Sequence, residues 1–329
     1  MTTRPTCIDL FAGAGGLSLG LKKAGWKTVA AAEYDRAACE TYRRNFDGVN
    51  VLEGDVRGVD WRGFRGKIDL VAGGPPCQPF SVAGNQLAHE DDRDMLPEFV
   101  RAIREIRPQL LLMENVAGLT TSRNLPYFEA RLDELRRLGY DLHFKVLNAA
   151  DYGVPQERMR VIVLGGLNSR PEFPRASHGT SKKPHLSASS ALVDVPEDEP
   201  NKAIITYAKN PVIRPSPWAG MLVNGGGRPI NLAEPAQTIP ASAGGNRTHI
   251  IDASGVLLDY HAHLLKGGTP RSGIVSGTRR LTLRESARLQ SFPDGFAFAG
   301  EKSAKFRQVG NAVPPDLGQA IGTALLTGL

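Results

Sequence analysis

The sequence predicts an α/β protein with a doubly wound, mostly parallel sheet and a smaller, loop-rich second domain. Short apolar runs alternate with stretches of helical periodicity through residues 1–170, which is the pattern of successive βα units in a parallel sheet. A glycine-rich turn joins the first apolar run to the first helical stretch, a device typical of doubly wound sheets. After Pro171 the chain is rich in Gly, Pro, Ser and Asn and has few periodic apolar segments, which favours loops.

Length and composition exclude several classes of protein. With 329 residues, of which 41% are hydrophobic and 22% are charged, we expect one large or two medium soluble domains. No apolar run is long enough to span a membrane and the N-terminus does not resemble a signal peptide, so a cytoplasmic protein is expected. The three cysteines are odd in number and far apart, which excludes a disulfide framework and gives no zinc-binding spacing. The net charge of +6 favours a polyanionic partner, although many basic proteins bind none.

The first expected βα unit consists of a strand at 6–11, a glycine turn at 12–16 and a helix at 17–24. Glycines let the backbone approach a ligand, and the N-terminus of the helix faces that ligand. The turn differs from the dinucleotide pattern G-x-G-x-x-G, because Ser18 stands where the last glycine would be. A glycine-rich turn by itself is weak evidence for a bound cofactor.

Two carboxylates follow the next two expected strands, at 27–32 and 49–53. Glu33 comes after the second strand, where an acid typically accepts hydrogen bonds from a ribose diol. Its alternative role is a helix-start carboxylate, and Asp55 is alternatively a simple loop acid. Tyr34 would pack on an adenine or on the domain itself. Helices are expected at 36–45 and 95–106, the second of them beyond the next strand.

A single cysteine lies on an unusually stiff loop. The apolar strand at 68–72 is followed by the segment Gly-Gly-Pro-Pro-Cys-Gln-Pro-Phe-Ser, residues 73–81. Two glycines allow a turn and three prolines stiffen the chain around Cys77. A thiol held at the end of a strand is placed for nucleophilic attack, whereas most lone cysteines are small buried hydrophobes. The polar, aperiodic residues 82–94 that follow predict a lid, or else a surface turn without function.

Another expected strand, at 109–113, ends at Glu114. The carboxyl ends of parallel strands share one edge of the sheet, so the glycine turn, Cys77 and Glu114 are expected to converge there. The alternative for Glu114 and Asn115 is a cap for a helix expected at 124–138.

Two further strands are expected at 142–147 and 161–167. If the linker between them is extended, Gln156, Arg158 and Arg160 share one face and form a cationic row at the edge of a sheet. Such a row suits a phosphate or a base, and a solvated strand face is the alternative.

The second domain is expected to be loop-heavy. Residues 187–200 are interpreted as a linker and residues 224–228 as a loop tip. Helical spacing returns at 283–290, and the chain ends in a helix at 314–326 that has Pro315 at its start. The predicted boundaries are 1–170 plus 296–329 for the first domain and 171–295 for the second.

These segments, in this order, resemble the DNA (cytosine-5)-methyltransferase family of bacterial restriction-modification systems. The resemblance covers nearly the whole chain except the middle of the second domain, and the ordered set is very specific. The matching segments are Asp9 to Gly16 (cofactor motif), Pro75-Pro76-Cys77-Gln78 (nucleophile), Glu114-Asn115-Val116 (catalytic glutamate), Gln156-x-Arg158-x-Arg160, Thr238-Ile239, Arg280 to Glu285 through Phe292-Pro293 (bracing of the recognition domain) and Gln308 to Pro314 (closure of the cofactor pocket).

The resemblance implies a sheet of the S-adenosylmethionine-dependent type, this cofactor with S-adenosylhomocysteine as product, no metal, and a target-recognition domain in the second half. It implies stacking of Phe11 near the adenine, binding of the ribose by Glu33 and contact of Asp55 with the adenine amino group. The implied cofactor-binding residues are Asp9, Phe11, Ala12, Gly13, Gly15, Gly16, Leu17, Glu33, Tyr34, Asp55, Val56, Gly74, Pro76, Asn311 and Ala312. The implied catalytic residues are Cys77, Glu114, Arg158 and Arg160, and the residues expected to contact DNA are Ser81, Gln86, Arg93, Gln156, Arg228, Thr238, Arg247 and Arg271.

The implied reaction begins with addition of Cys77 to C6 of a cytosine that has been flipped out of duplex DNA. C5 then attacks the methyl group, and loss of the C5 proton expels the thiolate. Glu114 would hold the ring nitrogen N3, for which its carboxyl must carry a proton, while Arg158 and Arg160 would grip the base carbonyl and a phosphate. No residue is an obvious base for the C5 proton, so water is a plausible acceptor.

Two departures from the family pattern stand out. Several relatives have serine where this chain has Ala312, and a small residue or an amide is commoner than Asp94 after the arginine of the lid. Three alternatives stay open: an RNA methyltransferase, a non-catalytic DNA-binding relative and, further away, an NAD-linked oxidoreductase. The expected protein is a monomer that acts on double-stranded DNA, with any companion restriction endonuclease acting separately.

Overall fold

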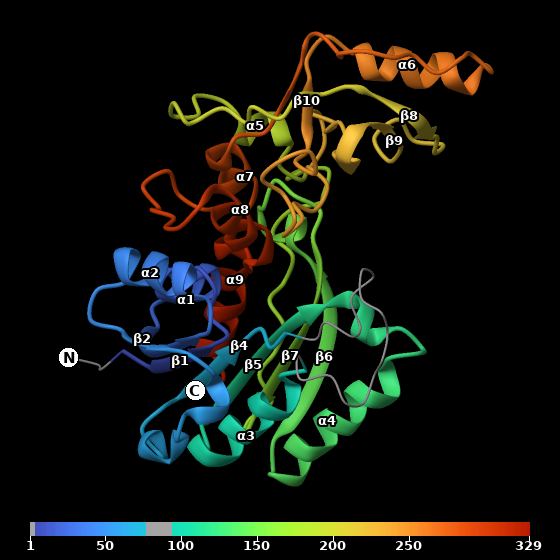
Figure 1. Cartoon of the computed structure of the whole chain (residues 1–329). Coiled ribbons are helices and arrows are strands. Elements are labelled where there is room, and N and C mark those ends of the chain that lie inside the picture. The colour runs from blue at the N-terminus through green and yellow to red at the C-terminus, as the bar shows by residue number, and fades with distance from the viewer. Residues whose placement is uncertain (1–3, 77–93) are drawn as a thin grey trace.

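The computed structural model describes residues 4–76 and 94–329 (Figure 1). In these residues a seven-stranded sheet forms the base of the molecule. Its strands are β1 (Thr6–Leu10), β2 (Lys27–Glu33), β3 (Asn50–Glu53), β4 (Leu70–Gly73), β5 (Leu110–Val116), β6 (Asp141–Asn148) and β7 (Met159–Gly166). All seven strands expected from the apolar runs are therefore confirmed, and no strand end shifts by more than three residues.

The strand order is β3-β2-β1-β4-β5-β7-β6, and every neighbouring pair from β3 to β5 is parallel. Strand β7 runs in the opposite direction to the other strands of this sheet, since it pairs antiparallel with both β5 and β6. The order reverses between β1 and β4, so the carboxyl ends of these two central strands open where ligands bind in doubly wound sheets. The predicted α/β class with a mostly parallel sheet is confirmed.

Residues of β1, β4, β5 and β7 are divided between two separate apolar cores, as expected for a sheet covered on both sides. One face packs against α3 (Leu96–Ile106) and α4 (Leu125–Arg137). The other packs against α1 (Gly16–Ala24) and α9 (Pro315–Leu326). Helix α2 (Arg36–Asn45) follows β2. Tyr42 of this helix and Phe46 directly after it belong to a third apolar cluster, which continues into the second half of the chain.

The last helix packs directly on the first. Gly20 of α1 faces the backbone of α9 so closely that an added Cβ would lie 2.4 Å from the Pro315 oxygen. Gly322 accepts a 2.9 Å hydrogen bond from Trp26 Nε1 just beyond α1. Pro315 is the first residue of α9, as its sequence position predicts, and its missing N–H costs nothing there. The C-terminal helix is thereby built into the sheet domain.

The elements from α5 to β11 form the upper part of Figure 1, and this region has a small core of its own. Its elements are α5 (Ala188–Ala191), β8 (Tyr207–Val212), β9 (Met221–Val223), β10 (Ile250–Asp252), α6 (Val256–Leu265) and β11 (Thr278–Arg280). Helices α7 (Leu283–Leu289) and α8 (Lys302–Asn311) then lead back to α9. Short 3-10 turns occur at Val56–Gly58, Trp61–Phe64, Ala117–Thr120, Ala149–Tyr152 and Asn224–Gly226.

Several sequence expectations need correction. Helices α6 and α8 were not predicted, and the stretch interpreted as a linker contains the short helix α5. Glu114 does not follow its strand but lies inside it, since β5 continues to Val116 against β7. Arg160 is the second residue of β7, opposite Val116 at the end of β5, so it lies at the carboxyl-end edge of the sheet but not on an outer strand. Among the described residues, no helix is both long and apolar enough to cross a membrane.

Candidate active site

The glycine turn after β1 is tight because other parts of the chain press against it. An added Cβ on Gly15 would lie 2.5 Å from the ring of Phe46, and one on Gly16 would lie 2.3 Å from the carbonyl oxygen of Val313. Ala312, next to Val313, is 9% exposed and contacts the same turn. The predicted final motif therefore lies beside the first motif, although the two are three hundred residues apart.

A buried hydrogen-bond chain lies behind this turn. The Ser18 hydroxyl donates to Asp9 Oδ2 at 2.6 Å, and the Tyr42 hydroxyl donates to Ser18 Oγ at 2.6 Å. Burial raises the pKa of Asp9 to about 7, against the lowering effect of the Ser18 hydroxyl, and the charge of Glu33 raises it further. Ser18 and Tyr42 were not predicted as site residues, although Ser18 at the position of the third glycine was a visible signal.

Glu33 stands at the end of β2, beside the glycine turn. Its two carboxylate oxygens accept hydrogen bonds from the Gly13 N–H at 2.8 Å and from the Asp35 N–H at 2.7 Å. Burial raises the pKa of Glu33, and these backbone donors partly oppose the shift. A carboxylate has acceptor positions left after two such bonds, so Glu33 is suited to bind a ribose diol.

The adenine end of the expected cofactor site is open. Tyr34 is 78% exposed, so its ring has no packing partner that buries it. Asp55 begins the turn after β3 and forms an ion pair with Arg57 at 2.6 Å, which holds the pKa of Asp55 below its usual range. Because β3, β2 and β1 are adjacent, Asp55, Glu33 and the glycine turn follow one another along the sheet edge. This donor and acceptor set fits a nucleoside.

The loop that leads to the expected nucleophile is fixed to the end of β5. Asn115 Nδ2 donates a buried 2.8 Å hydrogen bond to the Pro75 oxygen. An added Cβ on Gly74 would lie 3.1 Å from Glu114 Oε2, so the carboxylate lies directly beside this loop. The start of the loop and Glu114 are therefore adjacent, whereas Cys77, the group expected to converge with Glu114 and the glycine turn, lies outside the described residues.

Four predicted site residues lie outside the described residues: Cys77, Ser81, Gln86 and Arg93. The chain on either side is joined, because the Met95 N–H donates to the Pro76 oxygen at 3.1 Å. Asp94, which departs from the family pattern, accepts from the Leu96 N–H at 3.2 Å and from the Tyr127 hydroxyl. Asp94 thus helps to fix the start of α3.

The two arginines of the third active-site motif lie near Glu114. Arg160 Nε is 2.9 Å from Glu114 Oε1. Arg158 is 1% exposed, and its Nη2 donates to the Gly310 oxygen at 2.9 Å. Burial and the neighbouring charge of Arg160 lower the pKa of Arg158 well below its ordinary value, while Glu114 opposes the shift.

Three polar atoms in this cluster are buried without a hydrogen-bond partner among the described residues: Glu114 Oε1, Arg158 Nε and Arg158 Nη1. Buried polar groups are usually hydrogen-bonded, and exceptions require an explanation. One acceptor and two donors gathered at the carboxyl end of β5 are complementary to a polar planar ligand.

Gln156 lies on the same side of the chain as the two arginines, since Glu157 and Met159 between them are exposed. That side faces the protein interior, and Gln156 is fully buried. Its Nε2 donates to the Leu289 oxygen at 3.0 Å, and its Oε1 accepts from the Ile239 N–H at 2.9 Å. In this conformation Gln156 joins the two halves of the chain and is not exposed to a DNA surface.

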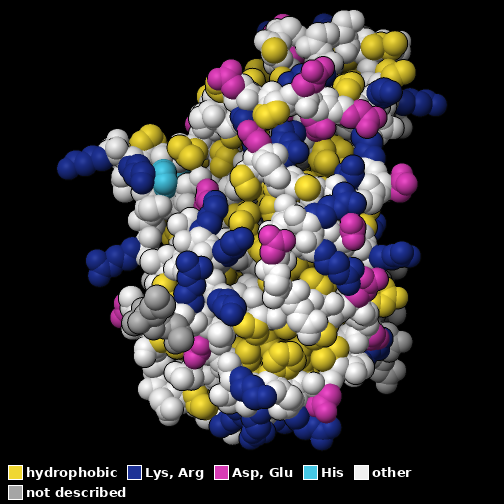
Figure 2. Space-filling model, turned by 90° about the vertical axis from the view of Figure 1, so that its left-hand side faces the viewer, with side chains coloured by type: hydrophobic (Ala, Val, Ile, Leu, Met, Phe, Trp, Pro, Cys, Tyr) yellow, Lys and Arg dark blue, Asp and Glu magenta, His cyan; other side chains and the backbone are white. Residues whose placement is uncertain are grey.

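The remaining predicted DNA contacts are on the surface of the second half. Arg228, Arg247 and Arg271 are exposed, and so is Thr238, whose hydroxyl donates to the Glu157 oxygen at 2.7 Å. The guanidinium of Arg271 stacks 5.5 Å from the ring centre of Tyr260. On the face shown in Figure 2, Lys and Arg side chains are spread over the whole length and are not gathered in one patch. Charge alone therefore does not locate a DNA surface on that face.

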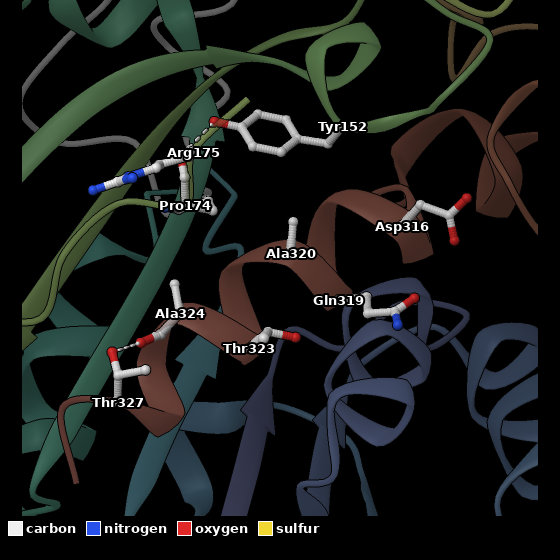
Figure 3. Close-up of a pocket in the computed structure, with 9 residues that line it drawn as sticks. All are labelled: Tyr152, Pro174, Arg175, Asp316, Gln319, Ala320, Thr323, Ala324 and Thr327. Carbon is white, nitrogen blue, oxygen red and sulfur yellow. Dashed lines mark hydrogen bonds between the residues drawn. The ribbon is translucent and has the colours of Figure 1, made fainter. Parts of the chain in front are cut away.

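A hollow of about 600 Å³ lies away from these residues, along α9 (Figure 3). Its walls come from one side of α9, from Tyr152 and from Arg175, and the Tyr152 hydroxyl donates to the Pro174 oxygen at 3.1 Å. None of the predicted site residues lines it.

Comparisons with known proteins agree with this arrangement. A family model described as C-5 cytosine-specific DNA methylase matches residues 5–327. The chain is 35% identical to Type II methyltransferase M.NgoMIV of Neisseria gonorrhoeae, over 98% of each protein. It is 38% identical to Type II methyltransferase M.Eco47II of Escherichia coli, over 98% of this chain and 78% of that protein. The crystal structure of the S. pombe Dnmt2 methyltransferase has the same fold, with a TM-score of 0.72, 19% identity, and 98% and 99% of the two chains covered.

Proposed function

Since this chain belongs to the C-5 cytosine-specific DNA methylase family and is a DNA (cytosine-5) methyltransferase, we propose that it uses S-adenosylmethionine and a covalent bond between Cys77 and cytosine C6. The target is a flipped-out cytosine in a specific duplex sequence. We further propose that residues 1–170 and 296–329 form the catalytic domain and residues 171–295 the target-recognition domain.

The cofactor would bind at the edge formed by β1, β2 and β3. Glu33 would accept hydrogen bonds from the ribose, and Tyr34 and Asp55 lie where the adenine end would be held. Phe11 and the glycine turn would contact the nucleoside from the β1 side. When bound, S-adenosylmethionine supplies an electrophilic methyl group.

The protein's own chemistry concerns the base. The Cys77 thiolate adds to C6, which makes C5 nucleophilic, and after methylation the C5 proton leaves and the thiolate is expelled. Glu114, which forms an ion pair with Arg160 in this structure, would hold N3 of the ring, and to donate there it must take up a proton when the base binds. Arg158 and Arg160 would bind the base carbonyl and a nearby phosphate oxygen, since guanidinium groups bind such acceptors strongly.

The observation that carries this assignment is a cluster of buried atoms that have no hydrogen-bond partner among the described residues: Arg158 Nε, Arg158 Nη1 and Glu114 Oε1, the last of which lies 2.9 Å from Arg160 Nε in an ion pair. A carboxyl group and two guanidinium donors can bind N3 and the carbonyl oxygen at the polar edge of a cytosine, whereas a packed protein interior would leave them without partners. The cluster lies beside Gly74, on the loop that precedes Cys77, so the ring and the thiol would meet there. The C5 proton is expected to pass to water.

The test is conversion sequencing of total DNA from a host that expresses this chain, beside a Cys77→Ser control. Methylcytosine confined to one short sequence, and absent from the control, is the expected result. It would identify the target as well as the reaction. If the DNA is unmodified while folded protein is present, the DNA substrate is wrong, and RNA is then the first alternative to assay.

Two partner assignments remain proposals. We expect the enzyme to act as a monomer on duplex DNA, and size-exclusion chromatography with light scattering would measure its mass in solution. The relatives named Type II methyltransferases suggest a companion endonuclease for the same sequence. Resistance of the modified DNA to a nuclease of that specificity would support the pairing.

A further inference from the structure

A buried arginine holds together the two loops that carry Arg228 and Arg247. Loop A is residues 224–228 and loop B is residues 244–248. Arg280, the last residue of β11, is 2% exposed beneath both loops. Its position is unusual, because a buried guanidinium normally has an acidic partner.

The two terminal nitrogens of Arg280 donate hydrogen bonds to different loops. Nη1 donates to the Thr248 oxygen of loop B at 2.8 Å. Nη2 donates to Asn224 of loop A, at 3.2 Å to the backbone oxygen and 3.1 Å to Oδ1. No acidic side chain of the described residues forms an ion pair with it, and its Nε has no hydrogen-bond partner there. The neighbouring Arg279, in contrast, pairs with Glu285 at 2.6 Å.

The loops also contact each other over Arg280. The Gly227 N–H of loop A donates to the Asn246 oxygen of loop B at 3.3 Å. An added Cβ on Gly227 would lie 2.3 Å from Arg280 Nη1 and 2.2 Å from the Thr248 oxygen. Glycine is therefore needed at this position so that the guanidinium can fit between the two loops.

The backbone next to Arg280 extends this connection. Ile250 of β10 pairs with Arg280 on one side, and on the other its N–H donates to the Arg228 oxygen at 2.9 Å. Arg228 of loop A and Arg247 of loop B are both exposed. A change at Arg280 would therefore alter the distance between two side chains that are candidates for reading bases or phosphates.

We propose that Arg280 is a positioning residue that fixes loops A and B relative to each other and thereby sets the sequence preference of the enzyme. Its positive charge, not neutralised by any ion pair among the described residues, also attracts DNA phosphates toward the loops. The specificity part of this inference rests on the proposed function, whereas the structural part does not.

The structural part is tested by hydrogen exchange in the full-length protein without DNA. In Arg280→Lys and in Gly227→Ala we expect the backbone amides of residues 227 and 244 to exchange about tenfold faster, because the first is hydrogen-bonded to Asn246 of loop B and the second to Thr248 within loop B. Gly245→Ala is the matched control, because an added Cβ there meets open space and the backbone is ordinary. Unchanged exchange in Arg280→Lys, or equal effects in the two glycine variants, would overturn the role of Arg280 in fixing the loops.

The specificity part is tested by comparing kcat/KM on the target duplex with kcat/KM on duplexes that carry one changed base pair. We expect Arg280→Lys to reduce this discrimination by about tenfold, within the range that one lost base contact produces. Arg279→Lys should leave it at the wild-type value. Faster exchange with unchanged discrimination would overturn the specificity part alone. Wild-type protein that leaves DNA unmodified would contradict the proposed function, and the exchange result would still decide the structural part.

Discussion

Arg160 Nε lies 2.9 Å from Glu114 Oε1, across the antiparallel pair β7 and β5. Both side chains are largely buried, with exposed fractions of 14% and 10%. Glu114 Oε1 nevertheless makes no hydrogen bond to the described residues, so the interaction is ionic and poorly aligned. The pair holds the carboxylate next to Gly74, at the start of the nucleophile loop, and Oε1 remains a buried acceptor without a hydrogen bond from the described residues.

A double-mutant cycle on this pair should show strong coupling. Removing one partner leaves a mostly buried charge unpaired, so Glu114→Gln and Arg160→Met should each lower the free energy of unfolding by about 3 kcal/mol. The double variant should lose about 1–3 kcal/mol less than the sum of the single losses. Urea denaturation measures these values. Additive losses would mean that the two side chains do not interact in solution.

Arg158 should behave in the opposite way, because its buried guanidinium makes a single hydrogen bond to the described residues, to a backbone carbonyl. We expect Arg158→Met to keep or raise the melting temperature, since an apolar side chain of similar length removes the cost of a buried cation. Turnover should fall by about 10²–10³-fold, because a donor to the substrate is lost. Thermal unfolding beside a methyl-transfer assay measures both. A large drop in melting temperature would assign Arg158 to stability.

Much of the sheet domain could be predicted because its elements depend on local patterns. Apolar runs and glycine turns mark the strands, and helix α2 was predicted with its observed ends at Arg36 and Asn45. Helix α6 was missed, although its buried residues Leu257, Tyr260, His261 and Leu264 have helical spacing, because the surrounding stretch is rich in loop-forming residues. Helix α8 has no such stripe, since its buried face includes Gln308 and Gly310.

The site was predicted less completely, because its geometry depends on pairing between distant strands. The shared side of Gln156, Arg158 and Arg160 follows from the period of an extended chain, and the structure agrees. Whether these three side chains point into the protein or toward solvent depends on the position of β7 between β5 and β6. A local sequence pattern does not predict that position. For the same reason Gln156 was expected to meet DNA, whereas it is fully buried between the two halves of the chain.

The contact between α1 and α9 predicts that a normally favourable substitution is harmful. Alanine in place of a helix-interior glycine gains about 1 kcal/mol of helix propensity. At Gly20 the new Cβ would lie 2.4 Å from the Pro315 oxygen, so the helices must separate. We expect Gly20→Ala to destabilise the protein by about 2 kcal/mol net, measured by urea denaturation. Gly63→Ala, where the Cβ meets open space, is the control and should not destabilise.

The Asp9–Ser18–Tyr42 chain predicts a pH dependence with a definite sign. The pKa of Asp9 is raised to about 7 in the folded protein, so between about pH 4 and pH 7 the folded state binds a proton that the unfolded state has lost. The stabilisation is complete below the unfolded pKa and disappears as the pH rises through the folded value, a loss on the order of 4 kcal/mol.

Asp9→Asn should remove this dependence, because the amide oxygen still accepts from Ser18 and no longer titrates. The difference in unfolding free energy between wild type and Asp9→Asn, measured in urea at several pH values, should shift steadily in favour of the variant from pH 4 to pH 7. Taking the difference cancels the titrating groups that do not interact with Asp9, whereas Glu33, whose charge acts on Asp9, contributes to the difference. Parallel curves would mean that Asp9 stays ionised over this range and that the buried chain stabilises the carboxylate instead of the acid.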